Sequence, residues 1–271
     1  MRLLQSDSRG GFTLTQTGAG DIPTYAILSH TWGEEEVTFR DMVNGSGNKK
    51  KGYKKIQFCG RQADRDGLEF FWVDTCCIDK SSSAELSESI NSMFQWYKEA
   101  KICYVFLSDV QSRQHHSQFE KEFWQSRWFT RGWTLQELVA PRNVEFYNAQ
   151  WEHIGSKLEH KLLISRITGI DIRVLEGADP AICNVAQRMS WASARNTTRV
   201  EDRAYSLLGL FHVNMPMIYG EKENAFIRLQ EEIIKNSEDY SLFAWHDHEI
   251  DKGSSLKSIY RGVLAYSPAN F

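Results

Sequence analysis

The segment from Ser126 to Pro141, SRWFTRGWTLQELVAP, concentrates the residue types that a buried polar site needs. It holds three aromatic side chains, two arginines and one acid, Glu137. A fixed carboxylate among aromatic side chains can stabilise positive charge that develops during a reaction. Thr134 and Glu137 are also spaced as in a capping box, in which the carboxylate only satisfies backbone N–H groups at a helix start. The catalytic and the capping interpretation of Glu137 both stay open.

Further polar residues follow two short apolar runs, residues 24–29 (TYAILS) and 68–74 (LEFFWVD). Each run is shorter than a typical helix, so each predicts a buried strand. A third run, residues 102–107 (ICYVFL), has the same character. The ends of the first two runs deliver the side chains that we single out as candidate ligand contacts: Ser29, His30, Trp32, Gly33, Asp74 and Cys76.

Helical patterns separate these runs. Apolar residues recur at helical spacing from Tyr53 to Ala63, and a capping box at Ser82 to Glu85 opens a second amphipathic pattern. The segment that carries Glu137 is the third predicted helix, and residues 144–147 are a fourth strand. This alternation predicts an α/β fold with a flavodoxin-like parallel sheet flanked by helices. Ligands of such sheets bind beyond the carboxyl ends of the strands, where Glu137 would lean over the same crevice.

The chain beyond Trp151 has a different, mostly helical pattern. No linker separates two independent domains, so we expect one domain over 1–271, with an α/β core of residues 1–150 and a helical extension of residues 151–271. Helices are expected at 158–167, 185–194, 204–211 and 225–234, and short strands at 241–245 and 261–266.

Composition excludes several classes of protein. The 271 residues are 41% hydrophobic and 25% charged with a net charge of -3, which gives no basic field for nucleic acid or anionic lipid. No apolar run reaches the roughly 18 residues of a membrane span, and no secretory signal pattern is present. We therefore expect a cytoplasmic protein with reduced cysteines. The sequence has no zinc-type ligand spacing and no Walker or Rossmann glycine loop, so we expect no metal.

Several longer motifs carry a family resemblance. YAILSHTWG at 25–33, FWVDTCCIDK at 71–80, SRWFTRGWTLQELVAP, TTRVEDRAYSLLGLF at 197–211 and MIYGE at 217–221 resemble, in this order, the motifs of the fungal heterokaryon incompatibility (HET) domain. Lys222 departs from the pattern, because family members often have glycine there. The resemblance implies a cell-death effector in self/non-self recognition that acts when clustered, often fused to a nucleotide-binding receptor.

A second resemblance is to the Toll/interleukin-1 receptor (TIR) domain. Trp133, Leu135, Glu137 and Leu138 reproduce its Trp-x-Leu-x-Glu-Leu pattern, and the resemblance implies that Glu137 is the catalytic residue for cleaving the nicotinamide–ribose bond of NAD. That reaction builds positive charge on the ribose, and its leaving group is already charged, so one carboxylate can suffice.

The resemblance also assigns roles around the substrate. Trp32 and Trp133 would stack on nicotinamide or adenine, and Ser29 and His30 would hydrogen-bond ribose or phosphate. Arg199 is a further candidate for a phosphate contact, although a structural ion-pair network is the simpler interpretation.

Each candidate also has a structural interpretation. His30 would be a core histidine, Cys76 a small core residue, and Asp74 a helix cap. At the level of function, the alternative to an NAD-consuming enzyme is a non-enzymatic death adaptor that signals by homotypic assembly. A third option is a nucleotide-binding regulatory module without turnover.

Overall fold

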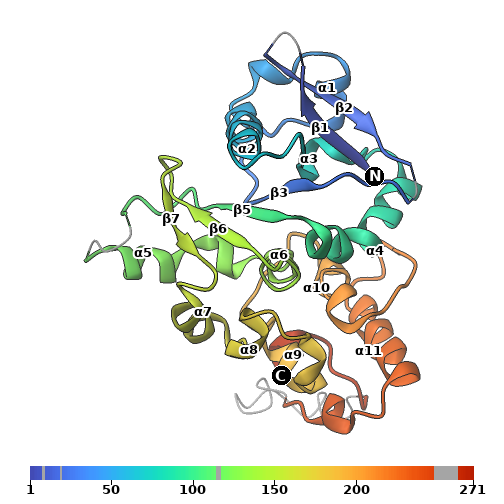
Figure 1. Ribbon diagram of the computed structural model, residues 1–271. Helices are drawn as coiled ribbons and strands as arrows, with labels where there is room; N and C mark the ends of the chain where they lie inside the picture. The colour runs from blue at the N-terminus through green and yellow to red at the C-terminus, as the bar shows by residue number, and fades with distance from the viewer. Residues whose placement is uncertain (8–9, 19, 114–116, 247–261) are drawn as a thin grey trace. The chain divides into compact units, whose positions relative to one another are not determined.

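The computed structural model describes residues 1–7, 10–18, 20–113, 117–246 and 262–271. The chain divides into two compact units (Figure 1). We call residues 1–128 and 140–160 the sheet unit, and residues 129–139 and 161–271 the helical unit. The expected domain layout, with a core of residues 1–150, stays a prediction.

The sheet unit contains one seven-stranded sheet in the order β2-β1-β4-β3-β5-β6-β7. The strands β4, β3, β5 and β6 are mutually parallel, and the outer strands β1, β2 and β7 run antiparallel to their neighbours. The strands are β1 (Arg2–Ser6), β2 (Phe12–Gln16), β3 (Tyr25–His30), β4 (Phe70–Trp72), β5 (Ile102–Phe106), β6 (Val144–Tyr147) and β7 (His153–Ser156).

The sheet confirms the predicted α/β class and adds strands that were not expected. Taken in chain order, the four parallel strands lie in the order second, first, third, fourth, which is the order of the flavodoxin-like sheet. The hairpin of β1 and β2 was not predicted, and β7 lies in a stretch expected to be helical. Each of these strands is only four or five residues long, which leaves little periodicity to detect.

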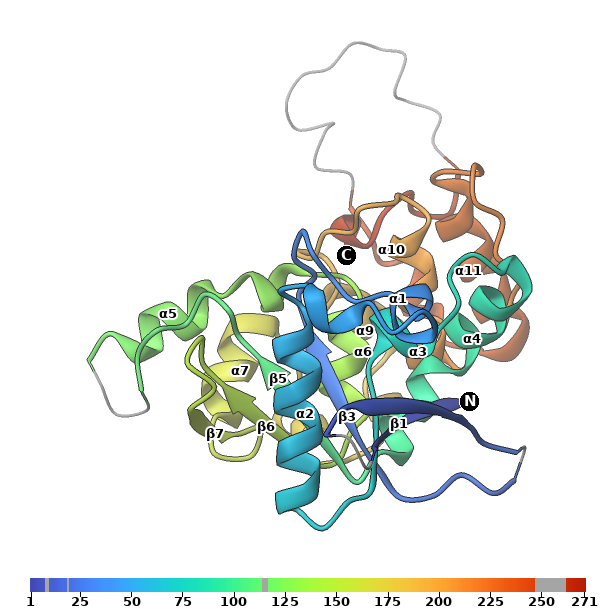
Figure 2. The same cartoon turned by 90° about the horizontal axis from the view of Figure 1, so that it is seen from above.

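Helices cover both faces of the sheet. Phe71 on β4 lies beside Gly60 on α2, whereas its neighbour Trp72 makes ring contacts with Trp96 and Tyr97 on α4. Successive strand residues point to opposite faces, so α2 and α4 lie on opposite sides (Figure 2). The helices of this unit are α1 (Phe39–Val43), α2 (Tyr53–Arg65), α3 (Asp74–Cys77), α4 (Ser83–Glu99) and α5 (Phe119–Gln125).

The helical unit confirms the helices expected after residue 160, although their bounds differ: the first two are shorter than expected, the third covers only the start of residues 204–211, and the fourth is longer. It contains α6 (Thr134–Val139), α7 (Lys161–Thr168), α8 (Ile172–Leu175), α9 (Val185–Ser190), α10 (Asp202–Tyr205) and α11 (Asn224–Asn236). The strand expected at 241–245 is wrong, because Tyr240–Phe243 forms a 3-10 helix whose start is capped by Asp239. Of the strand expected at 261–266, Arg261 lies outside the described residues, and residues 262–266 form no strand.

The segment that carries Glu137 forms a 3-10 helix (Arg127–Thr130) and is then interrupted before α6. Arg131 and Asn196 form a parallel bridge; the amide of Gly132 donates to the carbonyl of Asn196 (2.9 Å), and the amide of Asn196 donates to the carbonyl of Thr130 (2.6 Å). These bonds interrupt the helical course after Thr130, so α6 begins only at Thr134. The α-helix expected for the segment from Ser126 to Pro141 is therefore limited to Thr134–Val139.

The turn after the YGE motif departs from the family pattern at Lys222. Its φ is 53°, a left-handed value, and its amide donates to the Glu201 carboxylate at 3.2 Å. The preceding Gly220 also has a positive φ and donates to the same oxygen at 2.7 Å. The Glu201 carboxylate therefore organises this turn although a residue with a Cβ occupies a conformation that favours glycine.

We expect Lys222→Gly to raise the free energy of unfolding by roughly 0.5–1 kcal/mol, because glycine adopts this φ without the Cβ clash. Urea denaturation measures the change. Lys222→Ala is the matched control, since it removes the same charge and keeps a Cβ. An equal gain in both variants would show that the lysine charge, not the backbone, is responsible.

A second prediction concerns the close approach at Gly132. A Cβ at this position would collide with the Thr197 methyl group. We expect Gly132→Ala to lower the free energy of unfolding by about 1–3 kcal/mol through overpacking. Thr197→Ser removes the methyl and keeps the hydroxyl that donates to the Arg199 carbonyl, so the double variant should recover most of the loss. A fully additive double variant would contradict this packing account.

Candidate functional site

The predicted site residues are divided between the two units. The sheet unit holds Ser29, His30, Trp32, Gly33, Asp74 and Cys76, and the helical unit holds Trp133, Glu137 and Arg199. Each group is built from its own elements and forms its own set of contacts.

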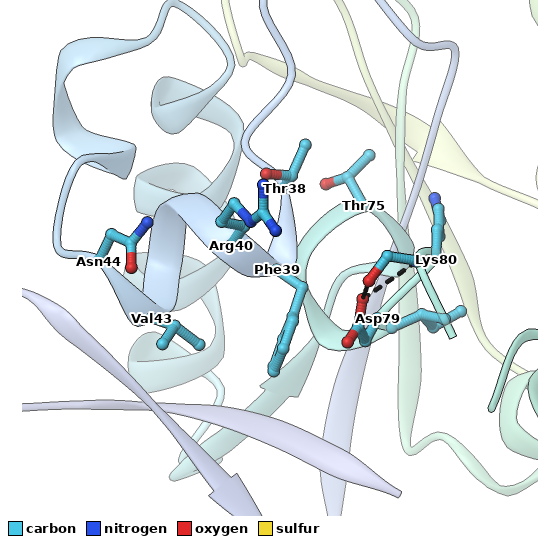
Figure 3. A pocket seen from close by; sticks show the side chains of 10 residues that line it. Thr38, Phe39, Arg40, Val43, Asn44, Thr75, Asp79 and Lys80 are labelled. Carbon is cyan, nitrogen blue, oxygen red and sulfur yellow. Dashed lines mark hydrogen bonds between the residues drawn. The ribbon is translucent and has the colours of Figure 1, made fainter. Parts of the chain in front are cut away.

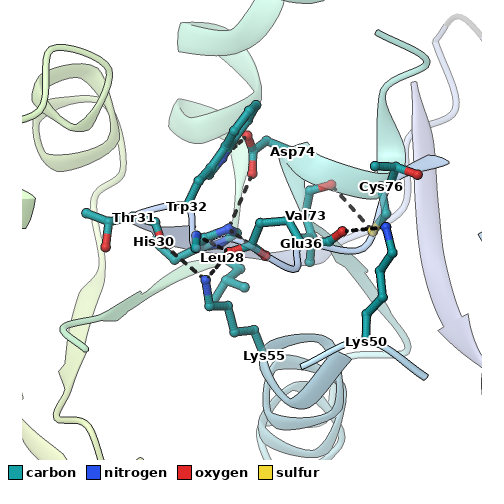
Figure 4. Close-up of polar contacts among 12 residues, drawn as sticks. Leu28, His30, Thr31, Trp32, Glu36, Lys50, Lys55, Val73, Asp74 and Cys76 are labelled. Atoms are coloured by element: carbon teal, nitrogen blue, oxygen red, sulfur yellow. Dashed lines mark hydrogen bonds and ion pairs between the residues drawn. The ribbon is translucent and has the colours of Figure 1, made fainter. Parts of the chain in front are cut away.

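In the sheet unit, Trp32 and Asp74 meet at the carboxyl ends of β3 and β4 (Figure 4). The Trp32 indole donates to the Asp74 carboxylate at 2.9 Å, and the Lys80 ammonium lies 3.6 Å from the centre of the Trp32 ring. Lys80 also donates to Asp74 at 3.4 Å. Trp32 is 52% exposed, so the cation on the aromatic face leaves part of the ring open to solvent.

Burial, neighbouring basic groups and hydrogen bonds set the pKa of Asp74. Burial acts to raise the pKa of Asp74, but Lys80, His30 and the hydrogen bonds from Lys80 and Trp32 outweigh burial and lower it. Asp74 is also the first residue of α3, so its negative charge lies at a helix start. The carboxylate is therefore ionised at neutral pH and serves as the shared acceptor of this cluster.

His30 is buried in the same cluster, and neither of its ring nitrogens forms a hydrogen bond with a described residue. Its Nε2 lies 3.7 Å from the Glu36 carboxylate and 3.9 Å from that of Asp74. Burial and the positive charge of Lys55 lower the pKa of His30 to about 4, although the two carboxylates act in the opposite direction. His30 is therefore a neutral imidazole at pH 7, held between two carboxylates.

Glu36 connects the loop after β3 to helix α2. It accepts from the Gly33 amide at 2.7 Å and forms an ion pair with Lys55, which also donates to the Thr31 carbonyl at 3.1 Å. The Gly33 amide is thus engaged within the loop. These contacts fix the backbone that carries Trp32.

Ser29 and Cys76 are fully buried. The Ser29 hydroxyl accepts from the Trp128 indole at 2.8 Å, and the Cys76 thiol lies 3.8 Å from the Val73 carbonyl. Burial raises the pKa of the Cys76 thiol well above its usual value, which makes it a poor nucleophile. This geometry is that of packed core residues.

A pocket of about 440 Å³ lies beside this cluster, between α1 and the loop after β4 (Figure 3). Arg40 and Thr75 face each other across it in this view, and Phe39 and Val43 supply apolar lining. Arg40, Lys80 and Asp79 bring charges of both signs to the lining, so the pocket offers polar contacts opposite an apolar surface. None of the predicted ligand contacts lines this pocket. Thr75 in the lining directly follows Asp74 in the chain, and Lys80 lines the pocket and also contacts Trp32 and Asp74.

In the helical unit, Glu137 lies on α6 and is 8% exposed. Thr134, one turn earlier, donates to the Arg131 carbonyl at 2.9 Å and accepts from the Arg195 guanidinium at 2.9 Å. Burial lowers the pKa of Arg195 to about 9, and the Glu137 carboxylate acts in the opposite direction. The acid of the central motif therefore has a buried cation as its electrostatic partner.

Trp133 and Arg199 lie in a second polar group of the same unit. The Trp133 indole donates to Asp202 at 3.3 Å, the Tyr219 hydroxyl donates to Asp202 at 3.0 Å, and the Arg199 guanidinium lies 4.3 Å from the centre of the Tyr219 ring. Burial raises the pKa of Asp202 against these hydrogen bonds and the charge of Arg199. Arg199 is exposed, so its guanidinium edge is open to an anion.

Sequence reasoning missed four residues that shape these sites: Glu36, Lys55, Lys80 and Arg195. Lys80 closes the FWVDTCCIDK motif and follows a strand end, which is a usable signal. Arg195 has no local signal, because its contacts reach the distant residues Arg131 and Thr134.

Two negative findings apply to the part of the chain that the structure describes. It contains no group of three or more histidine, cysteine or acidic side chains arranged to hold a metal ion. None of its helices is long and apolar enough to cross a membrane.

The burial of His30 gives a prediction for acid stability. The unfolded chain protonates this histidine near pH 6.5, whereas the folded protein protonates it near pH 4, so the unfolded state binds more protons between these values. Stability is therefore full above pH 6.5 and falls as the pH drops, by about 3 kcal/mol from His30 alone. Denaturation at pH 7 and pH 4 gives the free energy of unfolding of wild type and of His30→Leu. The contribution of His30 is the additional loss that wild type shows between these two pH values.

His153→Leu is the matched control, because it removes a half-exposed histidine paired with Glu145. We expect His30→Leu to lose little stability at pH 7, since neither ring nitrogen of His30 has a hydrogen-bond partner among the described residues. Equal acid sensitivity of wild type and His30→Leu would contradict a neutral buried imidazole.

Comparison with known proteins identifies the family. Residues 25–119 match the family model described as Heterokaryon incompatibility protein (HET), and residues 224–261 match Domain of unknown function (DUF8212). The chain is 47% identical over 280 aligned positions to vegetative incompatibility protein HET-E-1 of Podospora anserina. The alignment covers 98% of this chain and 21% of that protein, so the chain spans about a fifth of the length of this relative.

No solved structure matches the chain, and the resemblance to the TIR domain stays a prediction. The family match and the similarity to HET-E-1 confirm the first resemblance drawn from the motifs, and the chain belongs to the heterokaryon incompatibility (HET) domain family.

Proposed function

We propose that this chain is a cell-death effector domain of fungal heterokaryon incompatibility and that, when clustered, it hydrolyses the nicotinamide–ribose bond of NAD. The first part is supported by the similarity to a vegetative incompatibility protein over 98% of the chain. The second part is supported by the Trp-x-Leu-x-Glu-Leu pattern on α6 and by the flavodoxin-like order of the four parallel strands.

The observation that carries the enzymatic proposal is the environment of Glu137. Its side chain is almost fully buried on α6, beside a guanidinium that favours the ionised carboxylate. An ionised carboxylate held in low-dielectric surroundings stabilises positive charge on a ribose ring more strongly than one in water. Because nicotinamide leaves as a neutral base, the reaction needs no separate acid to protonate it.

The partners and location follow from the family resemblance and belong to the same proposal. The domain would act in the cytoplasm, self-associate for activation, and be fused to or triggered by a nucleotide-binding receptor. NAD would be a substrate, and the chemistry at Glu137 calls on no metal.

The contacts in the sheet unit support a second candidate, a non-enzymatic death adaptor. The Ser29 hydroxyl, the Gly33 amide and the Trp32 indole all have hydrogen-bond partners within the protein. Groups satisfied in this way must break existing bonds before they contact a nucleotide. An adaptor would use these residues only to hold its fold and would signal by assembly.

The test compares NAD turnover by wild type and Glu137→Gln, each fused to the same inducible clustering module. We expect Glu137→Gln to lower the turnover rate by about 10²-fold or more, equivalent to about 2.7 kcal/mol of transition-state stabilisation. Glutamine keeps the size of the glutamate side chain, so we expect little change in stability. Thermal unfolding of both proteins checks this. Glu145→Gln is a control for the loss of one negative charge at a partly exposed position of β6.

Clustered wild-type protein that leaves NAD intact would contradict the enzymatic proposal. Cell killing that persists in such a preparation would favour the adaptor. If Glu137→Gln lowers the melting temperature while turnover persists, Glu137 is a capping or packing residue.

A further inference from the structure

Arg195 is a buried cation of the helical unit, and it is 7% exposed. Its guanidinium is anchored by donations to the Trp191 carbonyl (3.2 Å), the Arg131 carbonyl (3.0 Å) and the Thr134 hydroxyl (2.9 Å). Two of these acceptors belong to the segment that leads into α6. The position of the guanidinium is therefore fixed relative to the start of this helix.

The remaining donor group of Arg195 has no hydrogen bond. Its Nη2 is buried and lacks a partner among the described residues. Burial of a guanidinium with an unsatisfied donor costs free energy, and it also disfavours the charged form. The carboxylate that counteracts this effect is Glu137.

Helix geometry places the two charges on one face of α6. Thr134 and Glu137 are three residues apart in this helix, so their side chains lie on the same face. Arg195 is bonded to Thr134 and hence lies at the face that carries Glu137. Coulomb interaction is mutual, so the cation favours the ionised form of a carboxylate that burial alone would drive toward protonation.

We propose that Arg195 is a positioning residue that acts through Glu137: its buried positive charge, anchored at the start of α6, keeps this carboxylate ionised at neutral pH. Its catalytic meaning rests on the proposed NAD hydrolysis, in which only an ionised Glu137 stabilises the developing positive charge. Arg195 itself does not contact substrate in this account, since its unpaired nitrogen is closed off from solvent.

The experiment compares wild type, Arg195→Gln and Arg195→Lys with two readouts. The first is the titration of the Glu137 carboxyl carbon by NMR, which needs no activity. The second is the acid limb of the pH profile of NAD turnover by the clustered chain. In Arg195→Gln we expect the pH midpoint of the Glu137 titration and that of the acid limb to rise by about one pH unit or more. This is the size of effect that a close opposite charge produces. Arg195→Lys keeps the charge and should restore midpoints close to those of wild type.

A purely structural arginine would give a different result. Arg195→Gln would then lower the melting temperature or the turnover rate and leave the Glu137 midpoint unchanged, which overturns the proposal. If Arg195→Gln does not fold, Arg195→Met replaces it, because methionine also removes the charge and keeps a long unbranched side chain. The midpoint should rise in that variant as well, and an unmoved midpoint overturns the proposal.

The two readouts separate this inference from the function on which it rests. Absence of NAD turnover in clustered wild type contradicts the proposed function, while the NMR titration still decides the role of Arg195. Turnover with an unmoved midpoint in Arg195→Gln contradicts the positioning role alone.

Discussion

The pairing of residues 130–132 with residues 195–197 governs what surrounds helix α6. Two backbone hydrogen bonds join these segments, and Gly132 is packed against Thr197 with no room for a side chain. The pairing delays the start of α6 to Thr134 and brings Arg195 to that helix start. The buried Arg195 guanidinium then lies at the face of α6 that carries the buried Glu137 carboxylate. Two buried charges are costly in an apolar interior unless each compensates the other. The chemistry proposed for Glu137 depends on this arrangement.

Electrostatics organise the sheet unit in a different way. At the ends of β3 and β4, two carboxylates and two lysines surround His30 without a hydrogen bond to its ring. Burial keeps the imidazole neutral, while the carboxylates tie down the loops: Glu36 holds the Gly33 amide, and Asp74 holds the Trp32 indole. The cluster therefore fixes the backbone at the strand ends, where ligands of parallel sheets bind. Trp32 is an exposed member of this cluster, and Arg40 in the lining of the neighbouring pocket is exposed as well.

The sequence predicted the parts of the fold that have strong local patterns. The four parallel strands and helices α2 and α4 follow from apolar runs and from helical spacing with caps. The hairpin of β1 and β2 and the short strand β7 were not predicted, because four or five residues of mixed burial carry almost no periodicity. For the site, strand ends and the α6 motif could be found locally, whereas Arg195 and Lys55 act through contacts that only the tertiary fold creates. Lys222 has a left-handed backbone conformation at a position where family members often have glycine. Here a departure from the family pattern, visible in the sequence, marked a real backbone constraint.

The central claim is that death signalling by this domain proceeds through consumption of NAD. The most direct measurement follows NAD and free nicotinamide over time in fungal cells after induced clustering of the chain, alongside loss of membrane integrity. The account predicts that nicotinamide rises as NAD falls, in equal molar amounts and before the membrane fails. Cells that die at constant NAD would contradict it.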